Sequence, residues 1–207
     1  VIQVIPLETV SAWWATERMC SAERITEQDG QLLLRLAKDA IESRLRCLPA
    51  QNLAACDVPE RLWQQGAAFV TLTLHGKLRG CIGHLQAKQP LVEDVVENAR
   101  HAAFEDPRFA PLHETEFAAL EVSLSILSTP QPMSFSSEQD LLRQIRPGVD
   151  GLILKDGQKQ GTFLPSVWES LPDAADFLRQ LKLKSGLPSD YWSDSLAVLR
   201  YTTQHFS

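Results

Sequence analysis

A cysteine lies between two glycines in the segment Gly80-Cys81-Ile82-Gly83, and Arg79 directly precedes this segment. In a regular strand Arg79, Cys81 and Gly83 project from one face, with alternate residues about 6.6 Å apart. A guanidinium reaches a thiol over that span. An adjacent cation favours the thiolate, which is the form that acts as a nucleophile or a metal ligand. Cys81 and Arg79 are therefore a candidate nucleophile and its activating cation.

The same residues also allow a structural interpretation. Cysteine often behaves as a small buried hydrophobic residue. Two glycines in a strand usually mean that another chain segment, a bulge or a ligand comes close to the backbone. Cys81 can then be a packing residue between Gly80 and Gly83, and both interpretations stay open.

Glu121 is the candidate acid or base. Residues 120–127 alternate between apolar and polar side chains, as in a half-buried strand, and Glu121 and Ser123 share the polar face. Glu121 can act as a general base or orient Arg79. It can equally form a plain structural salt bridge with Arg79.

A charged loop sequence, Asp106-Pro107-Arg108-Phe109, supplies further candidates. Its charged pair can bind a polar or anionic ligand at the rim of a cleft. The alternative is a local ion pair that fixes a turn.

Metal and hydrolase patterns are weak. Cys81 and His84 are the nearest potential pair of metal ligands, but their odd separation places them on opposite faces of a regular strand. No second pair of ligands stands nearby in the sequence. Ser123 and Ser125 lack the nucleophile elbow of a serine hydrolase. We therefore expect no metal site and assign no cofactor.

The composition is that of an ordinary folded protein. The 207 residues are 44% hydrophobic and 22% charged, with a formal net charge of −6. That charge argues against broad binding to nucleic acid or to an acidic membrane, and no apolar run is long enough to span a bilayer. The four cysteines form no C-x-x-C pair, which favours a reducing, cytoplasmic environment.

Hydrophobic periodicity predicts helices and hairpins around these residues. Helices are expected from Thr26 to about Leu48, with Asp29 as partner of the Thr26 cap, and then from Pro90, from Ser136 with Gln139 as a capping box, and over 173–185. Strands are expected over 67–74, 78–85, 120–127, 151–154, 161–164 and 196–201. Hairpin-linked strands with irregularly placed helices predict one α+β unit with an antiparallel or mixed central sheet flanked by helices.

A family resemblance rests on Leu78-Arg79-Gly80-Cys81-Ile82-Gly83, which closely resembles the signature of the AMMECR family. Further blocks resemble the family in the expected order: Ala68-Phe69-Val70-Thr71-Leu72, Asn98-Ala99, Ala102-Ala103-Phe104, Asp106-Pro107-Arg108-Phe109, Leu124-Ser125-Ile126-Leu127-Ser128, Pro147-Gly148-Val149-Asp150-Gly151-Leu152 and Phe163-Leu164-Pro165-Ser166-Val167-Trp168. The resemblance covers roughly residues 30–205 as a single domain, which leaves residues 1–29 as an N-terminal extension.

The resemblance implies a compact α+β fold of two unequal, interlocked subdomains, with the signature strand lining a cleft between them. The catalytic candidates are Cys81, Arg79 and Glu121. The candidates for ligand binding or for lining the cleft are Gly80, Gly83, Asp106, Arg108, Phe109, Ser123, Pro165 and Lys184. One departure concerns Leu181-Lys182-Leu183-Lys184-Ser185-Gly186, where relatives often carry a cysteine; a cysteine pair with Cys81 is therefore not expected, and Lys184 becomes a candidate partner.

No settled reaction comes with the family. Members are linked with a Memo-type protein and a radical SAM protein in the AmmeMemoRadiSam system, and this chain resembles that system's protein A. One hypothesis is a small-molecule enzyme or accessory subunit with Cys81 and Arg79 in its cleft. The other is a non-catalytic interaction module that docks a segment of the Memo-type or radical SAM protein.

Overall fold

The computed structural model describes residues 25–49 and 52–207. The helices within these residues are α1 (Glu27–Leu45), α2 (Leu91–Phe104), α3 (Glu114–Phe117), α4 (Glu138–Gln144) and α5 (Ala174–Lys184), with 3₁₀ helices η2 (Leu53–Ala55), η3 (Glu60–Trp63) and η4 (Pro165–Glu169). The strands are β1 (Gln65–Gly66), β2 (Ala68–Leu74), β3 (Lys77–Gly83), β4 (Gln89–Pro90), β5 (Leu120–Leu127), β6 (Gln131–Pro132), β7 (Gly151–Asp156), β8 (Lys159–Phe163), β9 (Ala197–Tyr201) and β10 (Thr203–Phe206).

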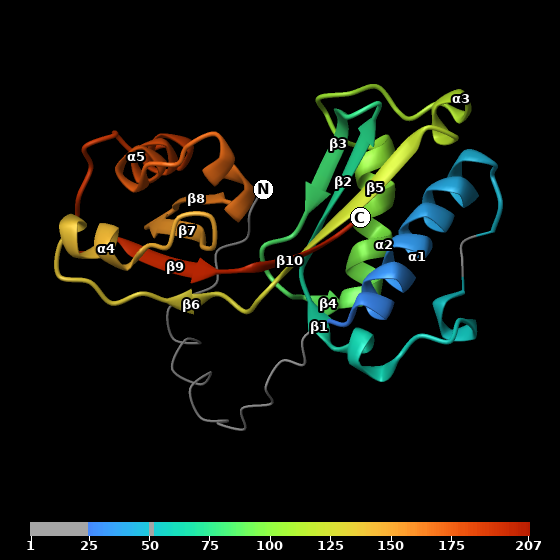
Figure 1. The fold of residues 1–207 in the computed structure, drawn as a ribbon, viewed down its shortest axis with the longest axis horizontal. Helices are drawn as coiled ribbons and strands as arrows, with labels where there is room; N and C mark the ends of the chain where they lie inside the picture. Colours follow the sequence, from blue (N-terminus) through green and yellow to red (C-terminus); the bar gives the residue numbers. More distant parts are fainter. Residues whose placement is uncertain (1–24, 50–51) are drawn as a thin grey trace.

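Two four-stranded sheets organise the molecule. The first has the strand order β10-β5-β2-β3 and the second β6-β9-β7-β8, and all their pairings are antiparallel. The sheets lie side by side in separate halves, which we call the first and second subdomains (Figure 1). The chain passes from one to the other between β5 and β6 and returns between β9 and β10. The α+β class with antiparallel sheets is confirmed.

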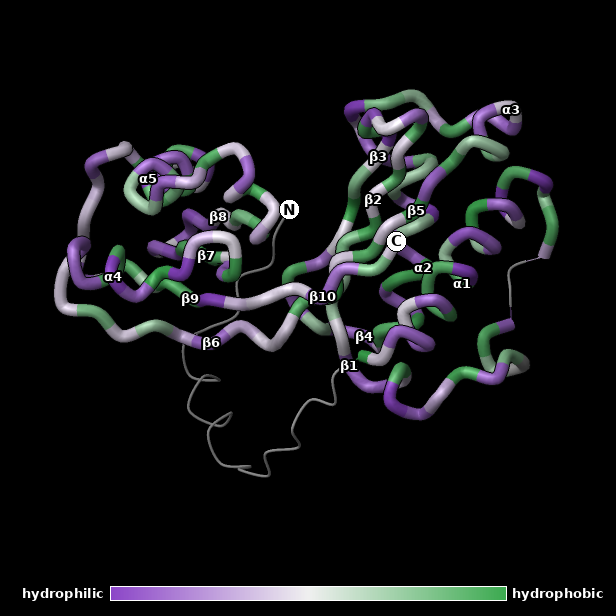
Figure 2. The backbone as a smooth tube through the Cα atoms, viewed as in Figure 1, coloured by the Kyte–Doolittle hydropathy of each residue, from purple (hydrophilic) through white to green (hydrophobic). Residues whose placement is uncertain are grey.

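The first subdomain buries its core between one face of the sheet and helices α1 and α2 (Figure 1). Helix α1 begins at the predicted cap: the Thr26 hydroxyl oxygen accepts the Asp29 N–H, and the Asp29 carboxylate accepts the Thr26 N–H. Asp29 also pairs with Arg61 of η3 at 2.7 Å, and this bond is the main reason that the pKa of Asp29 lies below its ordinary value. Hydrophobic and hydrophilic residues alternate along both helices (Figure 2).

The second subdomain has its own core around α5 and the β7–β8 hairpin. The Trp168 and Phe177 rings stack with centroids 3.8 Å apart. Lys182 is completely buried, and its ammonium bonds to the carboxylate of Glu138 at the start of α4 at 2.7 Å. Each sheet therefore has a separate hydrophobic core.

Several predicted boundaries need correction. Helix α1 ends at Leu45 rather than near Leu48, and α4 is capped by Ser137 through the Asp140 N–H rather than by Ser136 with Gln139. Strand β10 and helix α3 were not predicted. Most of the proposed extension at 1–29 lies outside the described residues. Helix α1 begins at Glu27 and runs across the proposed boundary near residue 30, and that boundary stays a prediction.

Candidate functional site

A β-bulge lies within the strand that carries the cysteine. In the pairing of β2 with β3, Leu72 is opposite Gly80 and Thr73 is opposite Leu78, so Arg79 has no residue opposite it. A bulge adds one residue to one strand and breaks the simple alternation of faces. The prediction that Arg79 projects beside Cys81 assumed a regular strand, and that assumption is wrong here.

The structure pairs Arg79 with Glu116 of α3, not with Glu121. The Arg79 Nε and Nη2 atoms donate to the two carboxylate oxygens of Glu116 at 2.8 and 3.0 Å. This bidentate pair raises the pKa of Arg79 and lowers that of Glu116. The Arg79 side chain is only 13% exposed, and its Nη1 atom is buried without a hydrogen-bond partner. Arg79 therefore holds α3 against β3.

The backbone of Cys81 is held at both of its polar groups by the loop 106–109. The Cys81 N–H donates to Asp106 Oδ2 at 2.9 Å, and the Cys81 carbonyl accepts from Arg108 Nη2 at 3.1 Å. Strand β3 is the edge of its sheet, so these side chains occupy the place of a neighbouring strand. The charged loop pair thus has a local structural role, and a role in ligand binding stays a prediction.

Asp106 and Arg108 form a tight ion pair beside the cysteine. The Arg108 Nη2 atom lies 2.7 Å from Asp106 Oδ2, and the Asp106 side chain is 1% exposed. Its bonds to Arg108 hold the pKa of Asp106 far below its ordinary value, and the Cys81 N–H contributes in the same direction. Asp106 is the main reason that the pKa of Arg108 is raised. Arg108 thus supplies a cation near Cys81.

Phe109 connects the two arginines. Its ring centroid lies 5.9 Å from the Arg79 guanidinium carbon and 5.5 Å from that of Arg108. Both distances suit cation–π attraction. The structure therefore brings five of the predicted residues into one network, namely Arg79, Cys81, Asp106, Arg108 and Phe109.

The Cys81 side chain lies on the face of the sheet opposite the helices. Cys81 is paired with Thr71, and Thr71 with Ser123, so these three side chains share one face. The Thr71 hydroxyl donates to the Cys81 Sγ atom at 3.3 Å. Cys81 is half-buried and belongs to neither hydrophobic core among the described residues, whereas Cys56 packs against the first core. Cys81 is therefore not a core packing residue.

The two glycines of the motif allow close approach of other parts of the chain. A Cβ atom at Gly80 would overlap the carbonyl oxygen of Ala102 in α2, so Gly80 faces the helix. A Cβ atom at Gly83 would overlap Phe69 and the carbonyl of Ala68 on β2. Backbone packing accounts for both glycines.

The remaining predicted residues lie apart from this network. Ser123 is two strand spacings from Cys81, about 10 Å. Glu121 is exposed and accepts a hydrogen bond from Thr73 at 2.9 Å. The Lys184 ammonium lies 5.0 Å from the Phe163 ring in the second subdomain, and partial burial lowers its pKa. Within the described residues, neither Glu121 nor Lys184 forms a hydrogen bond or an ion pair with Cys81.

A cavity of about 610 Å³ lies between the subdomains. Ser125 and His205 of the first sheet line one side, and Pro165 and Trp168 of the second subdomain line the other. Ser125 and His205 are paired in register on the same sheet face as Cys81. Neither Cys81 nor Arg79 lines the cavity itself.

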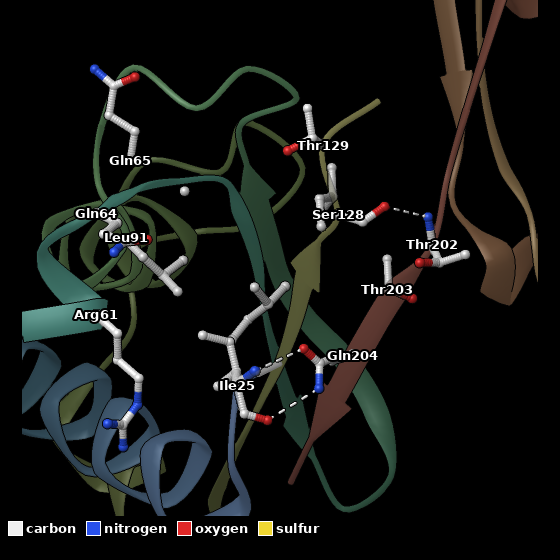
Figure 3. A pocket seen from close by; sticks show the side chains of 13 residues that line it. Ile25, Arg61, Gln64, Gln65, Leu91, Ser128, Thr129, Thr202, Thr203 and Gln204 are labelled. Carbon is white, nitrogen blue, oxygen red and sulfur yellow. Dashed lines mark hydrogen bonds between the residues drawn. The ribbon is translucent and has the colours of Figure 1, made fainter. Parts of the chain in front are cut away.

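A second cavity, of about 470 Å³, lies in the first subdomain and is lined by residues of β1, β5 and β10 (Figure 3). The Gln204 side chain closes one side of it by bonding the N–H and the carbonyl of Ile25, each at 3.1 Å. Arg61 is the charged residue in its lining.

Sequence reasoning missed an ion pair between the exposed His84 and the buried Asp94. His84 Nδ1 lies 2.6 Å from Asp94 Oδ1, and the buried Asp94 also accepts the Ala68 N–H and the Asn98 amide. The two residues are ten positions apart, one just after a strand and the other in the first turn of a helix. No sequence motif with this spacing predicts that their side chains meet. Within the described residues no three His, Cys, Asp or Glu side chains gather as metal ligands. No helix there is long and apolar enough to cross a membrane.

Fold and site together define an α+β protein with two four-stranded antiparallel sheets that presents a cysteine on an edge strand. The family model AMMECR1 matches residues 34–206, so the chain belongs to the AMMECR1 family. It is 37% identical over 189 residues to a protein of Methanothermobacter thermautotrophicus, covering 88% of this chain and 95% of that one, and 38% identical over 198 residues to a protein of Thermococcus gammatolerans, covering 88% and 92%. The crystal structure of an uncharacterized protein from Pyrococcus horikoshii is similar with a TM-score of 0.80 and 34% identity, covering 87% of this chain and 92% of that one.

Proposed function

We propose that this AMMECR1-family protein binds a small polar molecule on the open face of its first sheet, with the Cys81 thiol as the group that contacts and reacts with it. One observation carries the proposal. The Cys81 side chain lies on the sheet face opposite the α1 and α2 core, while its backbone is fixed at both polar groups by Asp106 and Arg108. A side chain held in this way is preorganised for contact with a ligand.

The surroundings of Cys81 favour chemistry at sulfur. The Thr71 hydroxyl donates to Sγ, and a donor stabilises the negative charge of a thiolate. Arg108, which bonds to the backbone of Cys81, is a permanent cation, and 53% of its side chain is exposed. In this proposal Arg108 takes the activating role that the sequence assigned to Arg79, which is committed to Glu116.

Alkylation of Cys81 tests this proposal. The intact protein is treated with iodoacetamide across a range of pH, and each cysteine is followed by peptide mass spectrometry. Cys47 is exposed and Cys56 is packed against the first core. Their alkylation rates serve as references for an accessible and a less accessible cysteine. We expect Cys81 to react faster than Cys47 at neutral pH, and Thr71→Val to slow Cys81 alone. A Cys81 that reacts only after unfolding would refute the proposal.

A matched pair of arginine variants separates the two candidate cations. Arg108→Lys keeps a charge near Cys81 but loses the forked hydrogen bonds, and Arg108→Gln loses the charge as well. We expect the alkylation rate of Cys81 to fall in the order wild type, Arg108→Lys, Arg108→Gln. Arg79→Lys should leave the rate close to wild type, since Arg79 bonds to Glu116.

The second candidate function is a non-catalytic interaction module in the cytoplasm that docks a Memo-type or radical SAM protein. The absence of Arg79 and Cys81 from the lining of the cavity between the subdomains favours it. Co-purification of either partner that survives Cys81→Ala, but not Pro165→Glu or Ser125→Glu at the cavity, would support this function. An unreactive Cys81 together with such co-purification would decide in its favour.

A further inference from the structure

The outer edge of β5 has a stretch with no strand beside it. Strand β2 pairs with β5 along its whole length, from Leu120 to Ile126. Strand β10 pairs only with its second half, because Phe206 lies opposite Leu124. In the part of the chain that the structure describes, residues 120–123 therefore have a neighbouring strand on one side only (Figure 1).

The backbone of Val122 points to this open edge. In an antiparallel sheet, successive residues direct their N–H and C=O groups to alternate edges. Leu127 directs its N–H toward the β2 side, where it bonds to the Ala67 carbonyl at 2.9 Å, and Ser128 directs its own to Thr202 on the opposite side. Counting back by twos from Ser128, Val122 has its N–H and C=O directed outward.

A groove of about 690 Å³ borders the open edge. Leu34, Arg35 and Lys38 of α1 form one side, and Leu120 and Val122 of β5 form another. The groove therefore combines apolar surface with backbone groups that can pair with an extended chain. Peptides that add a strand to a sheet use these two features.

The charge beside the groove favours an acidic occupant. Arg35 and Lys38 are exposed, and neither forms an ion pair within the described residues; the Lys38 ammonium lies 5.6 Å from the Phe117 ring. Arg44 and Arg108 of this subdomain are paired with carboxylates, whereas the exposed Lys77 and Lys88, which also lack an ion pair within the described residues, do not line the groove. Glu121 is the one residue in the groove lining with a carboxylate side chain, and this carboxylate already accepts the Thr73 hydroxyl.

The opposite edge of the same sheet shows the contrast. There the Asp106 and Arg108 side chains satisfy the N–H and C=O of Cys81 on β3. Proteins usually block sheet edges in such ways, because an open edge pairs with other chains. The first sheet is thus blocked at Cys81 on one edge, and on the other side it has an open stretch at residues 120–123 flanked by two unpaired cations.

We propose that the outer edge of β5 at residues 120–123 docks an extended acidic peptide segment of a partner protein. The peptide adds a strand to the sheet through the N–H and C=O of Val122. A carboxylate of the peptide lies against Arg35 and Lys38, and alternate apolar side chains contact Leu34. This site lies apart from Cys81 and does not depend on the proposed chemistry there.

The test uses the full 207-residue chain and a fluorescein-labelled six-residue peptide of alternating valine and glutamate with blocked ends. We expect fluorescence anisotropy to report binding, and hydrogen exchange at the Val122 amide to slow when the peptide is added. The double variant Arg35→Glu with Lys38→Glu should weaken binding by up to about twenty-fivefold, since each of the two exposed ion pairs contributes up to about fivefold in affinity. Lys88→Glu, at an exposed lysine on the loop after β3, is the matched control and should bind as wild type.

Two peptide controls make the proposal falsifiable. A peptide with N-methyl groups on alternate residues keeps its charge but cannot pair along a strand edge, and it should not bind. A peptide of alternating valine and lysine should also fail. Equal binding of either control, or a Val122 amide that is already protected without peptide, would overturn the proposal. Cys81→Ala should bind the valine–glutamate peptide normally, so failure of this site is distinguishable from failure of the proposed function.

Discussion

Replacement of Asp106 by asparagine tests whether the loop 106–109 fixes the cysteine strand. The Asp106 carboxylate accepts four hydrogen bonds, one from the Cys81 N–H and three from Arg108, at 2.7 to 3.1 Å. Asp106→Asn keeps the shape of the side chain but turns one acceptor oxygen into a donor. The donor then faces either the Cys81 N–H or the Arg108 guanidinium, both of which also donate.

The expected loss follows from these bonds. A hydrogen bond to a charged group contributes about 1.5 to 3 kcal/mol. Arg108 is half exposed, so water replaces much of what its guanidinium loses. The Cys81 N–H and the buried Asp106 have no such substitute, and we expect a decrease of about 2 to 3 kcal/mol in the free energy of unfolding. In a protein of this size that corresponds to a fall of roughly 5 to 10 °C in Tm.

The loss should depend on pH in a defined direction. Because the folded-state pKa of Asp106 is lowered, its stabilising contribution is complete above the unfolded-state pKa of about 3.9 and is lost as the pH falls through the folded-state pKa. Asparagine does not titrate. The difference in stability between wild type and Asp106→Asn should therefore be constant from about pH 5 to 8 and should shrink below about pH 4.

Urea unfolding of both proteins, followed by circular dichroism from pH 3 to 8, measures this difference. Asp39→Asn is the matched control, because Asp39 is an exposed carboxylate on α1. We expect the control to change stability by less than about 0.5 kcal/mol. A wild-type stability for Asp106→Asn at pH 7, or a difference that does not shrink in acid, would refute the assigned role of the Asp106 carboxylate.

Two further changes probe the packing of each subdomain. Gly80→Ala should lower the free energy of unfolding by about 1 to 3 kcal/mol, because its methyl group would overlap the backbone carbonyl of Ala102; urea unfolding measures this loss, and an unchanged midpoint would contradict it. Burial raises the pKa of Tyr201 to about 12. The neutral hydroxyl therefore contributes fully to stability below the unfolded-state pKa of about 10, and this contribution is lost as the pH rises toward 12. Ultraviolet titration of a Tyr191→Phe variant isolates Tyr201, and ionisation near pH 10 in the folded protein would contradict the assignment.

The fold could be predicted largely because its main elements have strong local signals. The Thr26 cap with Asp29, the apolar stripe of α2 and the turn at His75-Gly76 each specify an element through neighbouring residues. Strand β10 lacked such a signal: Thr203–Phe206 is short and mostly polar, and its pairing with β5 joins residues almost eighty positions apart. Its formation depends on tertiary contacts that periodicity does not show.

The site was harder to predict because one inserted residue changes which side chains meet. A regular strand places Arg79 beside Cys81, but the bulge directs Arg79 to Glu116. No residue pattern in the strand marks the bulge, since Gly80 is equally explained by its contact with α2. The cation at the cysteine is instead Arg108, which reaches β3 from a loop twenty-seven residues away.

Because Arg79 pairs with Glu116 and Arg108 lies at Cys81, substitutions of the two arginines should have different effects on stability and on the reactivity of Cys81. Arg79 is nearly buried, so its loss would leave Glu116 unpaired and loosen α3. Arg108 is half exposed and bonds to the Cys81 carbonyl and Asp106, so its charge is available to a ligand on the open face. Arg79→Lys should therefore lower stability with little effect at Cys81, and Arg108→Lys should change the reactivity of Cys81 more than stability. A protein in which both variants changed the two properties in the same proportion would show that the network acts as one structural unit, without a separate role for the cysteine.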